Sequence, residues 1–152
     1  MKLTILILTL FSYNSEIINV RDLFLSAYKS EIHCDDFGEK LYSINIDEDP
    51  LFTGYLGCYY FIKCKYTKNP VNKLYFFKEG KRLLESAIHQ DPSSVELRFL
   101  RYSIQKNLPR VLFYYDNLEE DLIFVNENVI HVRDKLTKNF VLHSLNTIDL
   151  WT

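Results

Sequence analysis

Glycine and proline are scarce in this chain, which has only four of each among its 152 residues. These two residue types form most tight turns, and a sandwich or barrel of many strands needs such turns at short intervals. Their scarcity argues against a many-stranded β-protein and favours helices joined by short loops. Hydrophobic residues make up 47% and aromatic residues 15% of the chain, which argues against intrinsic disorder and suffices for a packed core. The composition therefore predicts an all-α protein.

The chain also lacks a large excess of positive or negative charge, and its number of cysteines is odd. The formal net charge of -2 gives no general attraction to nucleic acid, and we predict no nucleic-acid partner. Cys34, Cys58 and Cys64 cannot all pair within one chain. Cys58 and Cys64 on one helix would lie about 9 Å apart along its axis, which is too far for a disulfide. We interpret the cysteines as buried structural thiols.

No apolar run approaches the length of a membrane-spanning helix, so no transmembrane segment is predicted. The run from Leu3 to Phe11 has a lysine before it and small polar residues after it, which is typical of a secretory signal peptide. We predict a signal peptide over residues 1–15, a single helical domain over residues 16–152, and export to the periplasm or secretion. Two alternatives stay open: cleavage after Ser12, and a short buried N-terminal helix or strand in a cytoplasmic protein.

Apolar residues recur at three- and four-residue steps through most of the chain, which is the period of amphipathic helices. Asn19 is the expected cap of one helix, and Asp49 and Asn69 each precede a proline that suits the first helical position. The expected helices span residues 19–29, 32–44, 50–65, 70–90, 94–108, 118–131 and 134–146. The aromatic stretch over residues 110–117, between the expected helices at 94–108 and 118–131, is expected to be a loop packed on the body. Residues 129–147 also contain β-forming residues, so a hairpin is the alternative there.

A helix–turn–helix joint lies between residues 79 and 100. Asp91-Pro92 ends the first helix, because the residue before a proline is disfavoured in helical geometry. Ser93 and Glu96 then have the spacing of a capping box, which begins a second helix. We predict that the second helix returns antiparallel to the first, and that the six or seven helices of the chain pack as antiparallel pairs.

Two of the expected helices carry a spaced set of small and aromatic residues. Leu56-Gly57-Cys58-Tyr59-Tyr60 is followed by Gly80, Leu84, Ala87 and Pro92. Residues 53–92 therefore resemble a tetratricopeptide repeat, which has L-G-x2-Y in its first helix and small residues before a proline in its second. Thr53 stands at the tryptophan position of that pattern. The second helix follows about eleven residues later than in the family, which is roughly three helical turns.

The resemblance implies a tetratricopeptide-like α-solenoid or bundle of stacked helix pairs, in which Gly57, Gly80 and Ala87 let the paired helices approach closely. Tetratricopeptide-like folds bind peptides or proteins on a concave face, so the resemblance also implies an interaction module. This second implication rests on analogy between folds.

One helix face groups three side chains suited to recognition. Arg98, Arg101 and Gln105 step by three and four residues, so they lie on one side of the helix over residues 94–108. Two guanidinium groups and an amide can hold a carboxylate or a peptide backbone through paired hydrogen bonds. The alternative is a salt-bridged face that pairs with Glu79 or Glu85.

Basic residues also outnumber acidic ones over residues 63–82. They either form a solvated helix face or attract an anionic partner. We predict that a protein or peptide partner binds a surface formed by both groups: Arg98, Arg101, Gln105, Lys78, Lys81 and Arg82.

Motifs of common catalytic and metal sites are missing from the sequence. It has no phosphate-binding loop, no dinucleotide fingerprint and no nucleophile elbow. His33-Cys34-Asp35-Asp36 is a cluster of metal-type ligands, but adjacent residues on a helix point apart, and the two aspartates suit a helix N-terminus. We assign no catalytic residue, no metal ligand and no cofactor.

Together these observations predict a non-enzymatic protein- or peptide-interaction module of the cell envelope. The alternative is a carrier that binds a small molecule or an anion, with the same basic residues around an apolar pocket. An enzyme is the third hypothesis, since catalytic groups can also converge from distant positions in a sequence.

Overall fold

Helices make up most of the residues that the computed structural model describes, which are 2–44 and 49–147, with side chains from Ser12 onward. In chain order they are α1 (Lys2–Ala27), α2 (Glu31–Tyr42), α3 (Pro50–Tyr66), α4 (Pro70–Gln90), α5 (Val95–Asn107), η2 (Arg110–Leu112), α6 (Leu118–Asn128), η3 (Val129–His131) and α7 (Lys135–Thr147), where η marks a short 3-10 helix. No strand occurs in this part of the chain, so the predicted all-α class with six or seven helices is confirmed. The alternative hairpin over residues 129–147 is not formed, because α7 occupies most of that segment.

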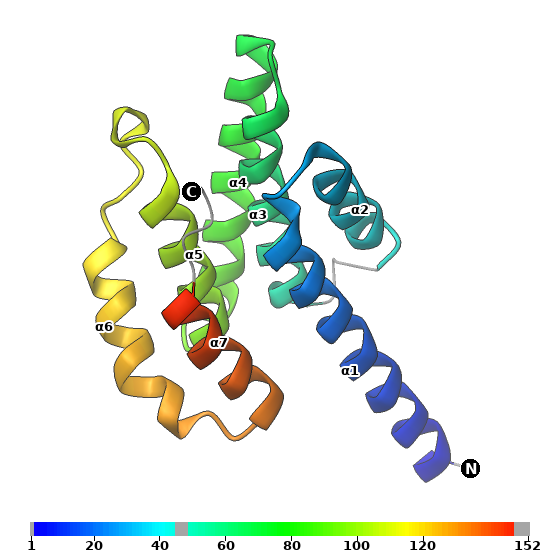
Figure 1. Ribbon diagram of the computed structural model, residues 1–152. Coiled ribbons are helices and arrows are strands. Elements are labelled where there is room, and N and C mark those ends of the chain that lie inside the picture. The colour runs from blue at the N-terminus through cyan, green and yellow to red at the C-terminus, as the bar shows by residue number, and fades with distance from the viewer. Residues whose placement is uncertain (1, 45–48, 148–152) are drawn as a thin grey trace.

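The antiparallel hairpin of α3 and α4 stands at the centre of the molecule (Figure 1). α1 and α2 pack on one side of it, and α5, α6 and α7 lie on the other side. The start of α1 extends beyond the other helices, away from the α3–α4 turn (Figure 1). One hydrophobic core joins both sides, because its buried side chains range from Ile17 in α1 to Val141 in α7.

Glycines bring α3 and α4 together along part of the hairpin. A Cβ atom at Gly57 would lie 2.9 Å from the carbonyl oxygen of Gly80, and one at Gly80 would lie 2.9 Å from that of Gly57. One turn earlier in α3, a Cβ at Gly54 would lie 3.6 Å from the Cβ of Ala87. The close approach predicted at Gly57, Gly80 and Ala87 is therefore present. We call residues 54–58 of α3 and 80–88 of α4 the closed half of the hairpin.

Two helices begin where their cap and proline pairs predict. The Asp49 carboxylate accepts a hydrogen bond from the backbone N–H of Leu51 at 2.8 Å, and α3 begins at Pro50. The Asn69 side chain accepts from the backbone N–H of Val71 at 2.8 Å, and α4 begins at Pro70. A polar cap satisfies backbone donors that the first turn leaves unpaired, and proline needs no such partner, so this pattern identifies a helix start locally.

The predicted helix start at Asn19 is wrong. Asn19 lies inside α1, which begins at Lys2 and continues without a break to Ala27. Asparagine favours the cap position because its side chain accepts from a free backbone N–H. That preference has no effect inside a helix, where the carbonyls of the preceding turn already accept from the backbone N–H groups.

The predicted capping box at the start of α5 is also wrong. Ser94, not Ser93, is the cap, and its hydroxyl accepts from the backbone N–H of Leu97 at 3.2 Å. Ser93 instead donates to the Asp91 carboxylate at 2.8 Å. Glu96 does not reach back to the cap, because its carboxylate is buried in the core. The helix thus starts one residue later than the box predicts.

A buried ion pair joins four helices around that carboxylate. Arg21 in α1 donates from Nε to Glu96 Oε1 at 2.9 Å and from Nη2 to Oε2 at 2.6 Å. The hydroxyl of Tyr55 in α3 donates to the same Oε1 at 2.5 Å, and Arg21 also donates to Thr137 in α7 at 2.8 Å. Arg21 and Glu96 are only 5% and 2% exposed. We call these four residues the core network, and its paired charges give it a structural role.

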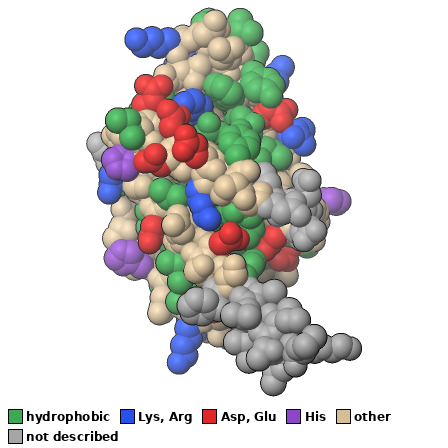
Figure 2. Space-filling model, turned by 90° about the vertical axis from the view of Figure 1, so that its right-hand side faces the viewer, with side chains coloured by type: hydrophobic (Ala, Val, Ile, Leu, Met, Phe, Trp, Pro, Cys, Tyr) green, Lys and Arg blue, Asp and Glu red, His purple; other side chains and the backbone are tan. Residues whose placement is uncertain are grey.

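The side of the molecule formed by α1 and α2 carries a group of acidic side chains beside a band of hydrophobic ones (Figure 2). Aromatic rings from three helices lie in series on the hairpin, with neighbouring ring centroids between 5.3 and 6.0 Å apart: Tyr42, Tyr59, Tyr60, Phe76 and Tyr75. The hydroxyls of Tyr42 and Tyr60 also share a hydrogen bond of 2.9 Å. These rings contact one another, so they attach α2 to the hairpin.

Candidate functional site

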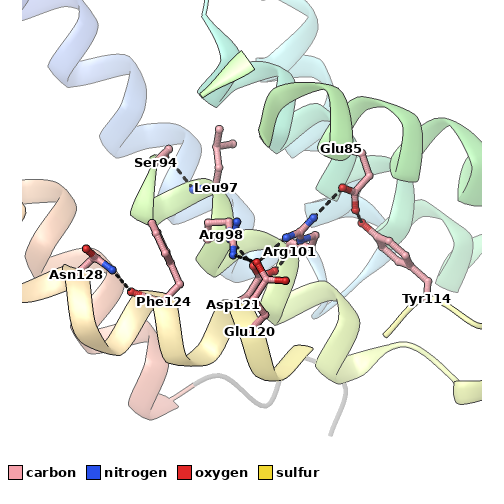
Figure 3. A network of polar contacts seen from close by, with 10 residues as sticks. All are labelled: Glu85, Ser94, Leu97, Arg98, Arg101, Tyr114, Glu120, Asp121, Phe124 and Asn128. Carbon is pink, nitrogen blue, oxygen red and sulfur yellow. Dashed lines mark hydrogen bonds and ion pairs between the residues drawn. The ribbon is translucent and has the colours of Figure 1, made fainter. Parts of the chain in front are cut away.

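The predicted recognition face of α5 is turned toward α6, where carboxylates of the chain itself occupy it (Figure 3). Arg101 donates from Nε and Nη2 to the two carboxylate oxygens of Asp121, at 2.6 and 2.9 Å. Its Nη1 donates to Glu85 in α4 at 2.8 Å. The side chains of Arg101 and Asp121 are both buried. The two-bond geometry that could recognise a partner carboxylate is therefore used to join α5 to α6.

Arg98 lies one turn away and is also paired within the chain (Figure 3). Its Nη2 donates to Glu120 at 2.5 Å, and its Nε forms an ion pair with Asp121. The guanidinium carbon lies 4.7 Å from the centre of the Phe124 ring. The salt-bridged alternative, with Glu85 as one partner, thus describes this face. A partner-binding role for Arg98 and Arg101 stays a prediction that requires these ion pairs to open.

Gln105 differs from its two neighbours on that face. It is 3% exposed, and neither atom of its amide has a hydrogen-bond partner among the described residues. A buried polar group without a partner costs roughly 1–3 kcal/mol, because it has lost its hydrogen bonds to water. The structure therefore leaves this amide without a structural explanation.

The basic residues predicted on α4 are at the surface. Lys78, Lys81 and Arg82 are exposed. Arg82 donates to Glu79 at 2.8 Å, and the Lys81 ammonium lies 4.9 Å from the centre of the Tyr114 ring. Since Arg101 and Gln105 are buried, the six predicted residues do not form one continuous exposed surface.

Tyr114 anchors the connection between α5 and α6 to the hairpin. Its hydroxyl donates to Glu85 Oε1 at 2.6 Å, and its ring stacks on Phe61 with the centroids 5.5 Å apart. Burial, followed by the bond to Glu85, raises the pKa of Tyr114 well above its ordinary value. The phenol therefore stays neutral and keeps donating its proton at any physiological pH. This anchor fixes the segment before it against the end of the hairpin.

An apolar groove with a volume of about 480 Å³ lies between that segment and the hairpin end where α3 turns into α4. Phe61, Leu74 and Phe77 line it from the hairpin, and Leu108, Val111 and Leu112 line it from the segment after α5. We call it the tip groove. The volume falls within the range of roughly 300–1,000 Å³ that is usual for ligand pockets.

Large apolar side chains around the tip groove are open to solvent. Leu74 is 53% exposed and Val111 is 73% exposed, and Val71 and Phe113 nearby in sequence are equally open. Phe113 has a φ of 49°, a left-handed backbone conformation that is uncommon for a bulky residue. Single exposed apolar residues are ordinary, but several around one apolar hollow mark an interaction site.

The charged side chains in the lining are all basic. Lys65 and Lys73 line the groove, and no carboxylate is among its lining residues. Cys64 also lines it, and burial raises the pKa of the Cys64 thiol to about 11. That thiol is protonated at neutral pH and is therefore a poor nucleophile. The lining thus favours binding of an apolar group with negative charge beside it.

Comparisons of the chain with models of protein families, with curated proteins and with solved structures found no match. The tip groove is therefore assigned from its own geometry and charge.

The His33–Asp36 cluster does not gather around a common point. His33 Nδ1 lies 2.6 Å from the Ser30 hydroxyl, Asp35 forms an ion pair with Lys63, and Cys34 is buried. Within residues 2–44 and 49–147, no group of three His, Cys, Asp or Glu side chains is placed to hold a metal ion. Over the same residues, no helix combines the length and the apolar character that crossing a membrane requires.

The cysteines are free thiols, and two of them are placed as predicted. Cys34 and Cys58 are buried, whereas Cys64 is half-buried at the tip groove. Burial raises the pKa of Cys34 to about 12 and raises that of Cys58 as well. The thiols in the core are therefore neutral packing groups.

Sequence analysis missed the tip groove. Leu74 has the spacing of a core residue, and the aromatic stretch after α5 was expected to pack on the body, yet Leu74, Val111 and Phe113 are exposed. The available signal was the four apolar or aromatic residues from Val111 to Tyr114 between two helices, of which only Tyr114 is buried.

Proposed function

We propose that the chain is a non-enzymatic protein- or peptide-interaction module that holds an apolar, acidic segment of a partner protein in the tip groove. The observation that carries this proposal is the group of exposed apolar side chains around a hollow that already has a defined shape. A preformed apolar site needs little rearrangement to bind, so less of the binding free energy is lost to ordering.

The charge of the lining sets the chemistry of the partner. Lys65 and Lys73 contribute positive charge, and none of the lining residues is acidic. The Lys65 ammonium already donates to the backbone carbonyl of Tyr28 at 3.0 Å, so Lys73 is the lysine that a partner's carboxylate would meet. Such a contact speeds encounter and selects against basic segments. We therefore expect a short segment with two or more apolar side chains next to aspartate or glutamate.

A second copy of this chain is a poorer occupant than such a partner. In a two-fold symmetric dimer the same patch meets itself, so the lysines of one tip groove would face those of the other. Like charges brought together across an interface oppose association. Self-association of the chain through this groove is accordingly an outcome that counts against the proposal.

The proposal also includes stacked helix pairs that resemble tetratricopeptide repeats. It is supported by the backbone contact between Gly57 and Gly80, which lie where the small residues of that pattern fall. Such helix pairs form interaction surfaces in many unrelated proteins, so the likeness favours binding over catalysis only by analogy.

Export to the cell envelope belongs to the same proposal. Tyr13 donates to Asp49 at 2.8 Å and packs edge-on against Phe52. Cleavage after Ser12 would keep these contacts and cleavage after Ser15 would remove them, so we expect the mature chain to begin at Tyr13. N-terminal sequencing of the protein from its host tests this, and an intact Met1 would contradict export.

The experiment for the groove is a selection from a random peptide display library on the immobilised protein. Leu74→Asp and Lys73→Glu are the test variants, because the first adds charge to the apolar wall and the second reverses the charge of the lining. Ile32→Asp is the matched control, since Ile32 is a 73% exposed apolar residue on α2. We expect enriched peptides with apolar residues flanked by Asp or Glu.

Those peptides should bind the Ile32→Asp variant as tightly as the unchanged protein and should lose at least about tenfold in affinity for either groove variant, an effect of about 1.4 kcal/mol. Enrichment of basic peptides, binding that ignores both groove changes, or a dimer that Leu74→Asp disrupts would each refute the proposed partner.

A further inference from the structure

Phe113 has a backbone conformation that its side chain does not favour. It follows η2 with φ 49° and ψ 44°, which is the left-handed region. No other non-glycine residue that the structure describes has a positive φ. In this region the Cβ of an L-residue crowds the carbonyl oxygen that follows it, so glycine and asparagine are the residues that commonly adopt it. The backbone at Phe113 is therefore strained.

The left-handed turn places two neighbouring aromatic residues in opposite surroundings. Before the turn, the backbone N–H of Phe113 donates to the carbonyl of Arg110 at 3.1 Å, which closes η2. After the turn, the Tyr114 ring stacks on Phe61 and its hydroxyl donates to Glu85 (Figure 3). Tyr114 is 4% exposed, whereas Phe113 is 73% exposed. Contacts on both sides of Phe113 thus hold the turn, and the Phe113 ring is not needed for it.

Packing of the Phe113 ring does not offset this strain. A side chain that stays mostly in water gains little from hydrophobic burial. Glycine or asparagine would form the same turn with less strain, and the fold would lose only an exposed ring. Strained backbone conformations cluster at binding sites, where the surrounding structure holds them in place. The ring at this turn is therefore suited to a contact with another molecule.

Phe113 is placed next to residues of the tip groove. Leu112 before it lines the groove, and Tyr114 after it stacks on Phe61, which also lines the groove. Phe113 itself is not among the lining residues. A ring beside the hollow can contact the part of a bound segment that extends outside the hollow. An aromatic ring supplies a large contact area there and loses little side-chain freedom, because it has only two rotatable bonds.

We infer that Phe113 is a specificity-determining contact beside the tip groove, and that its ring packs on an apolar side chain of the partner outside the groove. The inference rests on the proposed binding of an apolar, acidic segment. It adds one requirement to that segment, which carries apolar residues for the groove, an acidic residue for Lys73, and a further apolar or aromatic residue for Phe113. The preformed turn holds the ring in place before the partner binds, so little binding free energy is lost to ordering.

Two substitutions that both remove the ring test the strain. Glycine relieves the left-handed strain, whereas alanine retains it. In thermal unfolding followed by circular dichroism, Phe113→Gly should therefore melt about 2–4 °C above Phe113→Ala, a shift of the size that relief of one left-handed residue gives in a domain of this length. Equal melting temperatures would show that the turn does not strain the backbone, and would overturn the inference.

Calorimetry with the tightest peptide selected on the unchanged protein tests the contact. Phe113→Gly and Phe113→Ala should each bind this peptide at least about tenfold more weakly, a loss usual for an aromatic residue that anchors an interface. Phe113→Tyr keeps the ring and should bind as the unchanged protein does. Ile130→Ala is the matched control, because Ile130 is a 60% exposed apolar residue in η3, another short 3-10 helix. Its affinity should stay unchanged.

A double-mutant cycle shows whether the ring and the peptide touch. Each apolar residue of the peptide is changed to alanine, and each changed peptide is measured on the unchanged protein and on Phe113→Gly. At one position the change should have lost most of its effect on Phe113→Gly, because the ring that this position contacts is gone. Effects that multiply at every position would mean that no direct contact exists, and would overturn the inference.

The same measurements separate this inference from the proposed function. A loss of affinity in Leu74→Asp without a loss in Phe113→Gly would overturn the role of Phe113 and leave the groove as the binding site. A loss in neither variant would overturn both.

Discussion

At Gly57 a Cβ atom would meet the backbone of α4 at 2.9 Å, whereas at Leu74, in the same hairpin, 53% of the residue is open to solvent. The closed half thus uses its small and apolar residues to hold helices together, and the core network lies deep in the same packing. The apolar residues around the tip groove, such as Leu74, are instead exposed and can contact a partner. One pair of helices can therefore serve both stability and binding, because the two tasks use different turns of it.

The largest effect is expected at Glu96 of the core network, whose carboxylate accepts a hydrogen bond from Tyr55 in the closed half. Glu96→Ala leaves the buried Arg21 guanidinium and the Tyr55 hydroxyl without their acceptor, and should lower the free energy of unfolding by about 3–5 kcal/mol. Glu120→Ala removes a carboxylate of similar chemistry that is 63% exposed and should cost less than about 1 kcal/mol. Urea denaturation at pH 7 measures both.

A double variant shows whether the cost of Glu96→Ala is that of an unpaired charge. Arg21→Met combined with Glu96→Leu removes both charges and keeps apolar volume, so it should recover most of the lost stability. If the double variant is as unstable as Glu96→Ala, the core network contributes through its hydrogen bonds to Tyr55 and Thr137 instead.

The next largest effect is expected at the helix contact. Gly57→Ala places a Cβ 2.9 Å from two backbone atoms of α4, so the helices must separate, at a cost of about 1–3 kcal/mol. Gly38→Ala is the control, because the nearest atoms there belong to the half-buried ring of Tyr59, which can move. Alanine also favours a helix over glycine by about 1 kcal/mol. Equal losses of thermal stability for the two variants would argue against a backbone contact between α3 and α4.

Substitutions at the tip groove should leave the free energy of unfolding almost unchanged. Leu74→Ser and Val111→Ser change exposed side chains, so each should alter the free energy of unfolding by less than about 0.5 kcal/mol. The peptides selected on the unchanged protein should nevertheless lose affinity for both variants. A loss of several kcal/mol in stability would mean that the tip belongs to the core.

Two cysteines on α3 compare the regions without any mutation. Cys58 lies in the closed half and Cys64 at the tip groove, and burial raises the pKa of Cys64 to about 11. Because the thiolate is the reactive form, alkylation of Cys64 in the folded protein should be slow at pH 7 and rise about tenfold per pH unit from pH 8 to pH 10. Mass spectrometry should find Cys58 unmodified over this range. Modification of both at one rate would contradict the difference in packing.

Sequence reasoning predicted the features whose causes are local. The caps at Asp49 and Asn69 act within one turn. The small residues Gly57 and Gly80 predict a close helix contact without any knowledge of the rest of the fold. The capping-box role predicted for Glu96 was wrong because its partner, Arg21, lies 75 positions away in sequence. No local sequence pattern predicts such a pairing.

The candidate sites show the same limit. The spacing of Arg98, Arg101 and Gln105 placed them on one face, but whether that face is open depends on where α6 packs. Leu74 and Val111 face a groove only because Tyr114 is held by Glu85 and Phe61, two contacts that join distant segments. The exposure of a side chain thus depends on how the helices pack, and the helical spacing of residues in the sequence cannot predict it.

The most direct test of the account is a methyl NMR map of the protein, labelled at leucine and valine, with one of the selected acidic peptides. We predict chemical-shift changes at Leu74, Val111 and Leu112, and none at Leu84 or Leu97 in the core. Changes centred on the core leucines, or spread over the face of α1 and α2, would contradict the division of the hairpin into a closed half and a binding tip.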